Sequence, residues 1–180
     1  MRKWNFSAGP SVISQEVLKE VQSEVLEFKE SGMSLMEMSH RSDIFIDISK
    51  DAKKDFINLL KVPNDYDVLF LQGGATHQFS MIAFNYKHLS GTADYITTGS
   101  WTRKAFHEAT KIFDPNEIFK SDRDICKKVP NIEELKFSKN AAYLHYCPNE
   151  TIEGVAFHET PKIDIPLIAD MSSVILSQPL

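Results

Sequence analysis

The segment Val68–Phe79 constrains the fold of this chain more than any other stretch of its sequence. It opens with four apolar residues, Val68–Leu71, which have the length and composition of a short buried strand. Gly73 and Gly74 then interrupt the run, and residues Ala75–Tyr86 resume at helical spacing. A strand that leads through a glycine turn into a helix is the building unit of α/β proteins. The segment therefore predicts a sheet covered by helices.

The same glycine turn is a natural place for an anion. Two residues without a Cβ let a phosphate approach the backbone, and the first N–H groups of the helix point towards it. The Thr76 hydroxyl, next to Ala75, could add a donor. The segment lacks the Lys of a P-loop and the three spaced glycines of a dinucleotide fingerprint, so the expected ligand carries a single phosphate. The alternative is a tight strand–helix turn in which the glycines serve only the bend.

The rest of the chain reads as two helices followed by strands that alternate with helices. Ser14 suits the start of an amphipathic helix that we expect to end at Gly32, and a second helix is expected between Ser42 and Val62. Strands are expected over 93–97, 117–120, 141–147 and 163–169, and further helices over 101–111 and 130–135. This order predicts one α/β domain, a three-layer, mostly parallel or mixed sheet with helices on both faces.

The composition argues against several classes of partner. The net charge is −5 and the basic residues are scattered, so a nucleic-acid partner is not expected. No stretch is apolar for long enough to span a bilayer, so a membrane partner is not expected either. Cys126 and Cys147 form neither a C-x-x-C pair nor a disulfide framework, which favours two free thiols in a reducing cytoplasm.

Four features that suit a ligand fall just after predicted strands. They are the turn at Ala75–Thr76, the ring of Trp101, the hydroxyl of Thr151 and the carboxylate of Asp170. The carboxyl ends of strands in a doubly wound sheet converge on one crevice. Each feature also has a structural interpretation, because Trp101 could pack in the core and Asp170 could pair with a cation.

A ligand that touches all four features would have one phosphate, a flat ring, a polar ring substituent and a basic ring nitrogen. Pyridoxal phosphate has each of these, and a carboxylate beside its nitrogen would keep the ring protonated as an electron sink. Flavin mononucleotide would match the phosphate and the stacking group but leaves the acid unexplained. Arg41 could clamp a carboxylate or phosphate with its planar fork, although an isolated Arg or a neighbouring His40 is more often solvated or structural.

Short strings spread over nearly the whole chain match a known family in the order in which the family has them. They are N-F-S-A-G-P (5–10), M-S-H-R-S (38–42), G-G-A-T-H-Q-F (73–79), T-T-G-S-W (97–101), H-Y-C-P-N-E-T-I-E-G-V (145–155) and A-D-M-S-S-V-I-L-S-Q-P (169–179). The chain thereby resembles the phosphoserine aminotransferases, class-V pyridoxal-phosphate enzymes with the aspartate-aminotransferase fold.

The resemblance assigns a role to each candidate residue that follows a strand. It implies that Ala75 and Thr76 bind the cofactor phosphate and that Trp101 stacks on the cofactor ring. It also implies that Thr151 bonds the ring hydroxyl and that Asp170 bonds the ring nitrogen. No metal site is expected.

The resemblance also implies a substrate and a reaction. Arg41, with His40 nearby, would bind the anionic group of the substrate. The family moves an amino group between O-phospho-L-serine and 2-oxoglutarate, giving 3-phosphooxypyruvate and L-glutamate, in serine biosynthesis and in many bacteria in pyridoxine biosynthesis. Its members are dimeric, so a cytoplasmic homodimer is expected.

One part of the family pattern has no counterpart in these residues. The family holds its cofactor as a Schiff base on a Lys downstream of the motif matched at Asp170, whereas the last Lys here is Lys162. Transamination needs that amine to anchor the aldehyde and to carry the Cα proton.

Residues 1–180 are therefore expected to form most of the cofactor-binding large domain. Residues 1–15 would lie near the substrate mouth, while the Schiff-base lysine and the C-terminal small domain would be absent. Such a chain would be inactive by itself. The alternatives are a non-catalytic module that binds pyridoxal phosphate or phosphate, one half of a split enzyme, and a generic phosphate-binding domain.

Overall fold

The computed structural model describes residues 2–89, 92–122 and 128–178, which form two compact units. The first unit extends to Phe70, and the second runs from Leu71 to Gln178. Cys126, one of the two expected free thiols, lies outside the described residues. Among the residues that are described, no helix has the length and apolar character needed to cross a membrane.

The first unit contains two helices whose starts are set by serine caps. Helix α1 spans Gln15–Glu24, and the Ser14 hydroxyl accepts the backbone N–H of Val17. Helix α2 spans Asp43–Leu60, and the Ser42 hydroxyl accepts the N–H of Phe45 in the same way. Between them lies the short 3₁₀ helix η1, Leu35–Glu37. Both caps satisfy N–H groups that a helix start leaves without partners, so the predicted starts are confirmed.

The predicted end of the first helix is wrong, because α1 stops at Glu24 rather than at Gly32. Lys29, Glu30 and Gly32 all have positive φ angles, of 44°, 60° and 74°, which a right-handed helix does not contain. The N–H of Phe28 instead donates to the carbonyl of Met33 at 3.0 Å. Phe28 is buried inside this loop, so its apolar side chain serves the packing of a turn and not a helix face.

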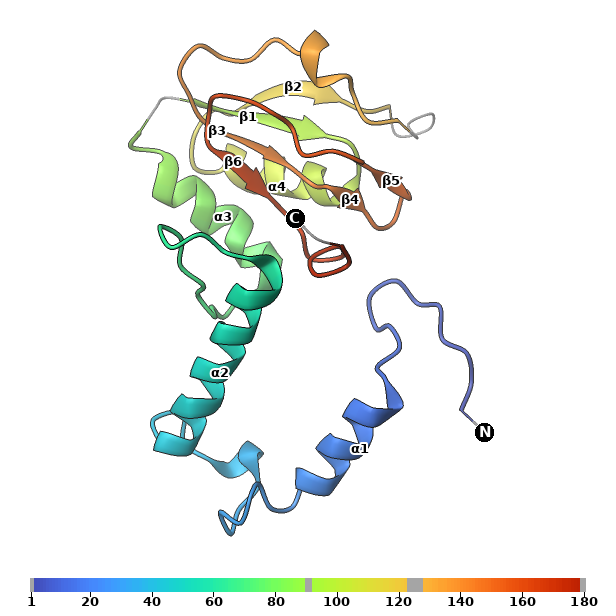
Figure 1. Cartoon of the computed structure of the whole chain (residues 1–180). Helices are drawn as coiled ribbons and strands as arrows, with labels where there is room; N and C mark the ends of the chain where they lie inside the picture. Colours follow the sequence, from blue (N-terminus) through green and yellow to red (C-terminus); the bar gives the residue numbers. More distant parts are fainter. Residues whose placement is uncertain (1, 90–91, 123–127, 179–180) are drawn as a thin grey trace. The chain divides into compact units, whose positions relative to one another are not determined.

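The second unit is built on a parallel sheet (Figure 1). Its strands are β1 (Thr92–Thr97), β2 (Asn116–Lys120), β3 (Ala141–Tyr146) and β6 (Leu167–Ala169), in the order β2-β1-β3-β6. All three neighbouring pairs are parallel. Two further strands, β4 (Asn149–Glu150) and β5 (Val155–Ala156), form a small antiparallel hairpin. The predicted α/β class with a mostly parallel sheet is confirmed.

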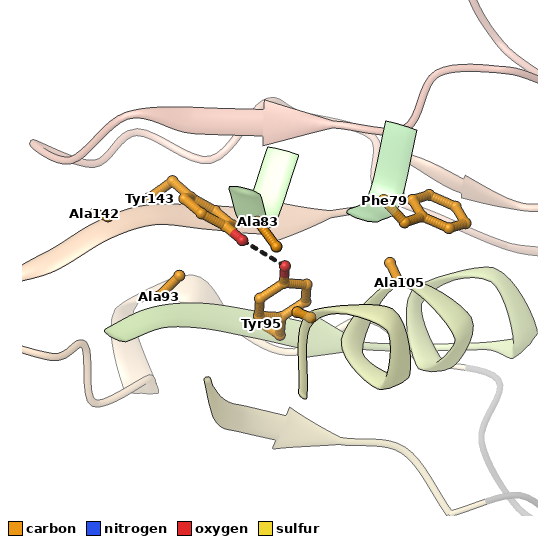
Figure 2. Close-up of a cluster of buried hydrophobic side chains, with 8 residues drawn as sticks. Phe79, Ala83, Ala93, Tyr95, Ala105, Ala142 and Tyr143 are labelled. Carbon is orange, nitrogen blue, oxygen red and sulfur yellow. Dashed lines mark hydrogen bonds between the residues drawn. The ribbon is translucent and has the colours of Figure 1, made fainter. Parts of the chain in front are cut away.

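Two helices cover one face of this sheet. Helices α3 (Gly74–Tyr86) and α4 (Ser100–Thr110) pack their small and aromatic residues against Tyr95 and Tyr143. Figure 2 shows these two rings meeting in the middle of the cluster, where their hydroxyl groups are 2.6 Å apart. Both rings are completely enclosed, so each hydroxyl depends on the other for its hydrogen bond.

The opposite face of the sheet is also covered. Ile96, Leu144 and Tyr146 form its buried core. The residues that pack on them come from less regular segments and from the 3₁₀ helix η2, Ile132–Glu134. Burial on both faces suits the sequence of β3, whose residues are apolar or aromatic apart from His145, whereas β1 also buries the polar residues Asp94 and Thr97.

The predicted strand at Val68–Leu71 is wrong. These residues form no strand, and Leu69 and Leu71 are 67% and 62% exposed. A strand forms only when a neighbour takes up its backbone hydrogen bonds, and none of the described residues pairs with this run. The helix predicted directly after it is nevertheless present as α3.

The predicted strand at 163–169 is correct only in its last residues. Strand β6 begins at Leu167, directly after Pro166, whose ring removes the backbone N–H. The carbonyl of Pro166 still accepts the N–H of Leu144 at 2.9 Å, which sets the register between β3 and β6.

Candidate functional site

The parallel strands bring three of the candidate residues to one edge of the sheet. Trp101 follows β1, Thr151 follows β3 through the short β4, and Asp170 directly follows β6. From β1 the chain continues to β2 on one side of the sheet, and from β3 it continues to β6 on the other side. The connections therefore separate between the neighbouring strands β1 and β3. In open α/β sheets this separation point, at the carboxyl ends of the strands, is where ligands bind.

A buried carboxylate connects the loops that follow β1 and β3. Glu150, completely enclosed in the fold, accepts the backbone N–H of Trp101 at 3.0 Å and that of Thr102 at 2.9 Å. The Thr102 hydroxyl also donates to the Glu150 carboxylate. Trp101 and Thr151 are thus held in one rigid arrangement, because Thr151 is the next residue after Glu150.

A second carboxylate completes the cap of helix α4. Glu153 accepts the backbone N–H of Ser100 at 2.8 Å and the Ser100 hydroxyl at 2.6 Å. It also pairs with the guanidinium of Arg103 at 3.0 Å. The first N–H groups of α4 are therefore taken up by the protein's own negative charges, which complement the helix dipole. The start of α4 leaves no place for an anionic ligand.

The start of helix α3 is different. Gly73 precedes it with a φ of 101°, and no side chain caps its first N–H groups. A Cβ on Gly73 would lie 2.4 Å from Nδ1 of His77, so both the angle and the space at this turn require glycine. The predicted anion site at Ala75–Thr76 consequently has the open helix start that it needs. Thr76 is exposed and Ala75 is partly buried.

Helix α4 contributes a positive charge to this open helix start. The ammonium group of Lys104 donates a hydrogen bond to the Thr76 hydroxyl at 2.9 Å. The same ammonium lies 5.8 Å from the centroid of the Trp101 ring. The turn at Ala75–Thr76 and the ring of Trp101 are therefore close neighbours within this unit.

Asp170 is fixed by backbone and side-chain bonds at the end of β6. Its N–H donates to the carbonyl of Tyr146 at 3.1 Å, which continues the ladder between β3 and β6. Its Oδ1 accepts the N–H of Ser172 at 3.1 Å and the Ser172 hydroxyl at 2.6 Å. Its Oδ2 has no hydrogen-bond partner among the residues that the structure describes. One oxygen thus orients the carboxylate, and the other is left for a ligand.

A buried histidine on β3, His145, lies close enough to Asp170 to interact with its charge. His145 stacks on Tyr95 with 5.0 Å between ring centroids and meets the edge of Phe79. Neither ring nitrogen has a hydrogen-bond partner within the described part of the chain. Burial lowers the pKa of His145 to about 4, against the opposing attraction of Asp170. This histidine is neutral at pH 7.

The neighbouring thiol is also neutral. Cys147 is buried, and its Sγ donates to the carbonyls of Asn149 and Asp170. Burial raises the pKa of the Cys147 thiol to about 12, and the nearby negative charges of Asp170 and Glu150 act in the same direction. A thiol in this state is not a nucleophile.

The remaining two candidates belong to the first unit. His40 and Arg41 are exposed in the turn that precedes α2, where the N–H of Arg41 donates to the hydroxyl of Ser39. Their role in substrate binding stays a prediction. Among the described residues no group of His, Cys, Asp and Glu is arranged to hold a metal ion.

Sequence reasoning missed the residues that organise the site. Glu150 stands beside Thr151, three residues after the predicted buried strand 141–147, so its position could have drawn attention to it. Lys104 lies three residues after Trp101, which places both on one face of α4. What the sequence could not show is the partner of each, because Glu150 meets α4 and Lys104 meets α3 only in the folded chain.

Comparison with known proteins places this geometry in a family. Residues 3–180 match the model of the family described as aminotransferase class-V. A phosphoserine aminotransferase from Pseudomonas syringae pv. syringae is 48% identical over 180 residues, which are 99% of this chain and 50% of the relative. Another, from Idiomarina loihiensis, is 44% identical over 179 residues, which are 98% of this chain and 50% of the relative.

Solved structures agree with the sequence comparison. Phosphoserine aminotransferase from Bacillus circulans subsp. alkalophilus has a TM-score of 0.94 at 43% identity, covering 99% of this chain and 50% of its own. The enzyme from Trichomonas vaginalis, described as bound to PLP, has a TM-score of 0.94 at 39% identity with the same coverage. The chain spans about half the length of the relatives it matches. Within that span the resemblance is confirmed, and the chain belongs to the class-V aminotransferase family.

Proposed function

We propose that this chain forms the cofactor-binding part of a phosphoserine aminotransferase. The reaction is the transfer of an amino group between O-phospho-L-serine and 2-oxoglutarate, giving 3-phosphooxypyruvate and L-glutamate, in serine biosynthesis and also in pyridoxine biosynthesis. The observation that carries the proposal is the open start of α3 beside Trp101, on the sheet edge that also presents Asp170. Identity of 44% and 48% to phosphoserine aminotransferases supports this choice of reaction within the family.

The residues of the second unit fit pyridoxal phosphate in their chemistry. The open N–H groups at Ala75 and Thr76 suit its phosphate, and the Trp101 indole offers a flat face for its ring. The Thr151 hydroxyl would bond the ring hydroxyl. The bound cofactor supplies an electron sink for reactions at the substrate Cα.

Asp170 is the residue that would control this chemistry. Ser172 holds its Oδ1, so its Oδ2 faces a ligand as a charged acceptor in a partly buried place. A carboxylate in that position keeps a proton on the ring nitrogen, because the positive charge of the protonated ring is stabilised by the negative oxygen. The buried, neutral His145 adds no competing positive charge at pH 7.

The amine that transamination requires is not found after Asp170 in this sequence, where the last Lys is Lys162. We propose that residues 1–180 alone bind the cofactor without turnover. A chain that carries the missing Lys would restore activity when mixed with them. Turnover by the 180 residues alone would refute this part of the proposal.

The central experiment compares Asp170→Asn with Asp164→Asn in the full-length natural protein. Asp164 is exposed, so its variant controls for the general loss of a carboxylate. We expect Asp170→Asn to lower transamination of O-phospho-L-serine by at least about 100-fold, as for other charge-stabilising groups in active sites. Asp164→Asn should retain the rate of the unchanged protein. Equal rates for the two variants would exclude the proposed role of Asp170.

We further propose that the whole protein is a cytoplasmic homodimer. We also propose that Arg41, with His40 nearby, binds the substrate's anionic group. The fork of an Arg suits a carboxylate or a phosphate in two-point contact, which a Lys does not reproduce. Arg41→Lys should therefore raise KM for O-phospho-L-serine more than it lowers kcat. Sedimentation of the full-length protein at micromolar concentration tests the dimer.

A further inference from the structure

Lys104 combines two properties that the proposed cofactor site does not explain by itself. Its ammonium is held beside the open start of α3 by the 2.9 Å bond to Thr76. Among the described residues, no carboxylate lies within 4.0 Å of it to form an ion pair. Two neighbouring cations do have such partners, since Arg103 in α4 pairs with Glu153 and Lys111, directly after α4, pairs with Glu108.

The charges near the starts of α3 and α4 differ, and this difference suggests what Lys104 does. At α4 the positive helix end is neutralised by Glu150 and Glu153. At α3 there is no such cap, and the nearby Lys104 adds further positive charge. A partly buried lysine placed against a positive helix end is unfavourable unless an anion joins them. The two features together select an anion at α3 and exclude one at α4.

The hydrogen bond to Thr76 also sets the direction of the threonine hydroxyl. An ammonium group can only donate, so the Thr76 oxygen is the acceptor in this bond. The hydroxyl hydrogen of Thr76 must then point elsewhere and is available to a second acceptor. Lys104 thus turns Thr76 into a hydrogen-bond donor beside the backbone N–H groups of the helix start.

We propose that Lys104 is a ligand of the phosphate group bound at the start of α3. It supplies a positive charge to the phosphate and orients the Thr76 hydroxyl to donate to it. The same side chain lies near the Trp101 ring, so it also joins the phosphate end of the site to the ring end. This inference rests on the proposed function, because the phosphate in question is that of pyridoxal phosphate.

The test measures ligand affinity rather than catalysis. The full-length protein is titrated with pyridoxal phosphate and with pyridoxal, which has the same ring and lacks the phosphate. Inorganic phosphate serves as a competitor. Lys104→Met removes the charge and keeps most of the stem, Lys104→Arg keeps the charge, and Lys111→Met, directly after the far end of α4, is the matched control.

We expect Lys104→Met to lower the affinity for pyridoxal phosphate and for inorganic phosphate by about tenfold, the effect of losing one charge-assisted hydrogen bond. Pyridoxal should bind equally to both proteins. The difference in phosphate affinity should shrink as salt is raised, because the contact is electrostatic and near the surface. Lys104→Arg should retain most of the affinity, and Lys111→Met should match the unchanged protein.

Thr76→Val tests the second half of the inference. Val keeps the shape of Thr and removes the hydroxyl, so it should also weaken phosphate binding. If Lys104 acts partly through this hydroxyl, the double variant will lose less affinity than the two single losses added together. Strict additivity would reject the orienting role of Lys104.

The outcomes separate this inference from the proposed function. If the unchanged protein binds pyridoxal phosphate and Lys104→Met binds it equally well, the role of Lys104 is rejected and the proposed function stands. Equal weakening of pyridoxal and pyridoxal phosphate would also reject it, because the loss would not depend on the phosphate. If the unchanged protein binds neither pyridoxal phosphate nor inorganic phosphate, both proposals fail.

Discussion

The Oε2 atom of Glu150 accepts the backbone N–H of Trp101 at 3.0 Å, deep inside the fold. This bond joins the loop after β3 to the first turn of α4, the two segments that carry Thr151 and Trp101. It does so with a carboxylate whose other oxygen accepts the N–H of Thr102. The geometry of the candidate site thus depends on an acid whose two oxygens are both taken up by the start of α4.

Replacing Glu150 by Gln should destabilise the fold. One of the two carboxylate oxygens would be replaced by an NH₂ group, a donor that faces a backbone N–H donor. The site would also lose the negative charge that complements the positive start of α4. We expect a loss of about 2–3 kcal/mol in the free energy of unfolding, measured by urea denaturation. The exposed Glu159→Gln is the control and should leave the urea midpoint unchanged. An unchanged midpoint for Glu150→Gln would show that the cap contributes little.

Gly99 provides an independent test of the same contact. Its φ of −161° is open to any residue, so only the available space restricts this position. A Cβ at Gly99 would lie 2.4 Å from Cδ of Glu150, which is far inside van der Waals contact. Gly99→Ala should therefore cost about 1–3 kcal/mol of stability, the usual effect of forcing extra volume into a packed place.

Two further comparisons show whether the effect of Gly99→Ala comes from its contact with Glu150. Gly9→Ala has nothing within 4 Å of its added Cβ and should change stability little. In a Glu150→Ala background the Gly99→Ala substitution should cost less, because Cδ and Cγ of Glu150 are gone and only Oε2 of Glu153, 2.6 Å from the added Cβ, remains of its three nearest atoms. If its cost is the same in both backgrounds, the contact with Glu150 is not the cause.

Local chemistry in the sequence was enough to place most helices and strands. Ser14 and Ser42 mark helix starts because a hydroxyl that precedes an amphipathic stretch caps its first N–H groups. Gly73, directly before α3, marks a turn because only glycine adopts its φ of 101° without strain. The ends of parallel strands then place Trp101, Thr151 and Asp170 on one edge by topology alone.

The errors arose where the outcome depends on distant partners. The apolar run Val68–Leu71 has the composition of a strand, but a strand also needs a neighbour, and composition does not show whether one exists. The apolar face of α1 extends to Phe28 in the sequence, yet burial of Phe28 in a turn outweighs the helix pattern. The contacts of Glu150 and Lys104 are likewise between segments far apart in the chain.

The paired hydroxyls of Tyr95 and Tyr143 should be coupled in stability. Their oxygens are 2.6 Å apart in the centre of the core (Figure 2), and burial raises the pKa of Tyr143 to about 12. Tyr143→Phe leaves the Tyr95 hydroxyl buried without its partner and should cost about 1–3 kcal/mol. The double change Tyr95→Phe with Tyr143→Phe should cost less than the sum of the single changes, since no unpaired hydroxyl remains. Urea denaturation of the four proteins measures the coupling, and additive losses would show that the hydroxyls are independent.

His145 should make the fold sensitive to acid. Burial lowers the pKa of His145 to about 4 from an ordinary value of 6.5. Between these two pH values the unfolded chain therefore binds a proton at His145, and the folded chain does not. The contribution of neutral His145 is therefore complete above about pH 6.5 and is lost as the pH falls towards 4. This difference between the two pKa values corresponds to a loss of up to about 3 kcal/mol in the free energy of unfolding as the pH falls from 6.5 to 4.

The matched variants isolate this one group from the other titrating side chains. His145→Phe places an uncharged ring against Tyr95 and Phe79 and should flatten the dependence of unfolding free energy on pH between 6.5 and 4. The control is His158→Phe at an exposed position, which should keep the slope of the unchanged protein. Urea denaturation at closely spaced pH values gives the slope directly. If His145→Phe and the unchanged protein lose stability in parallel as the pH falls, the acid sensitivity comes from other groups, and His145 accepts its proton inside the folded chain.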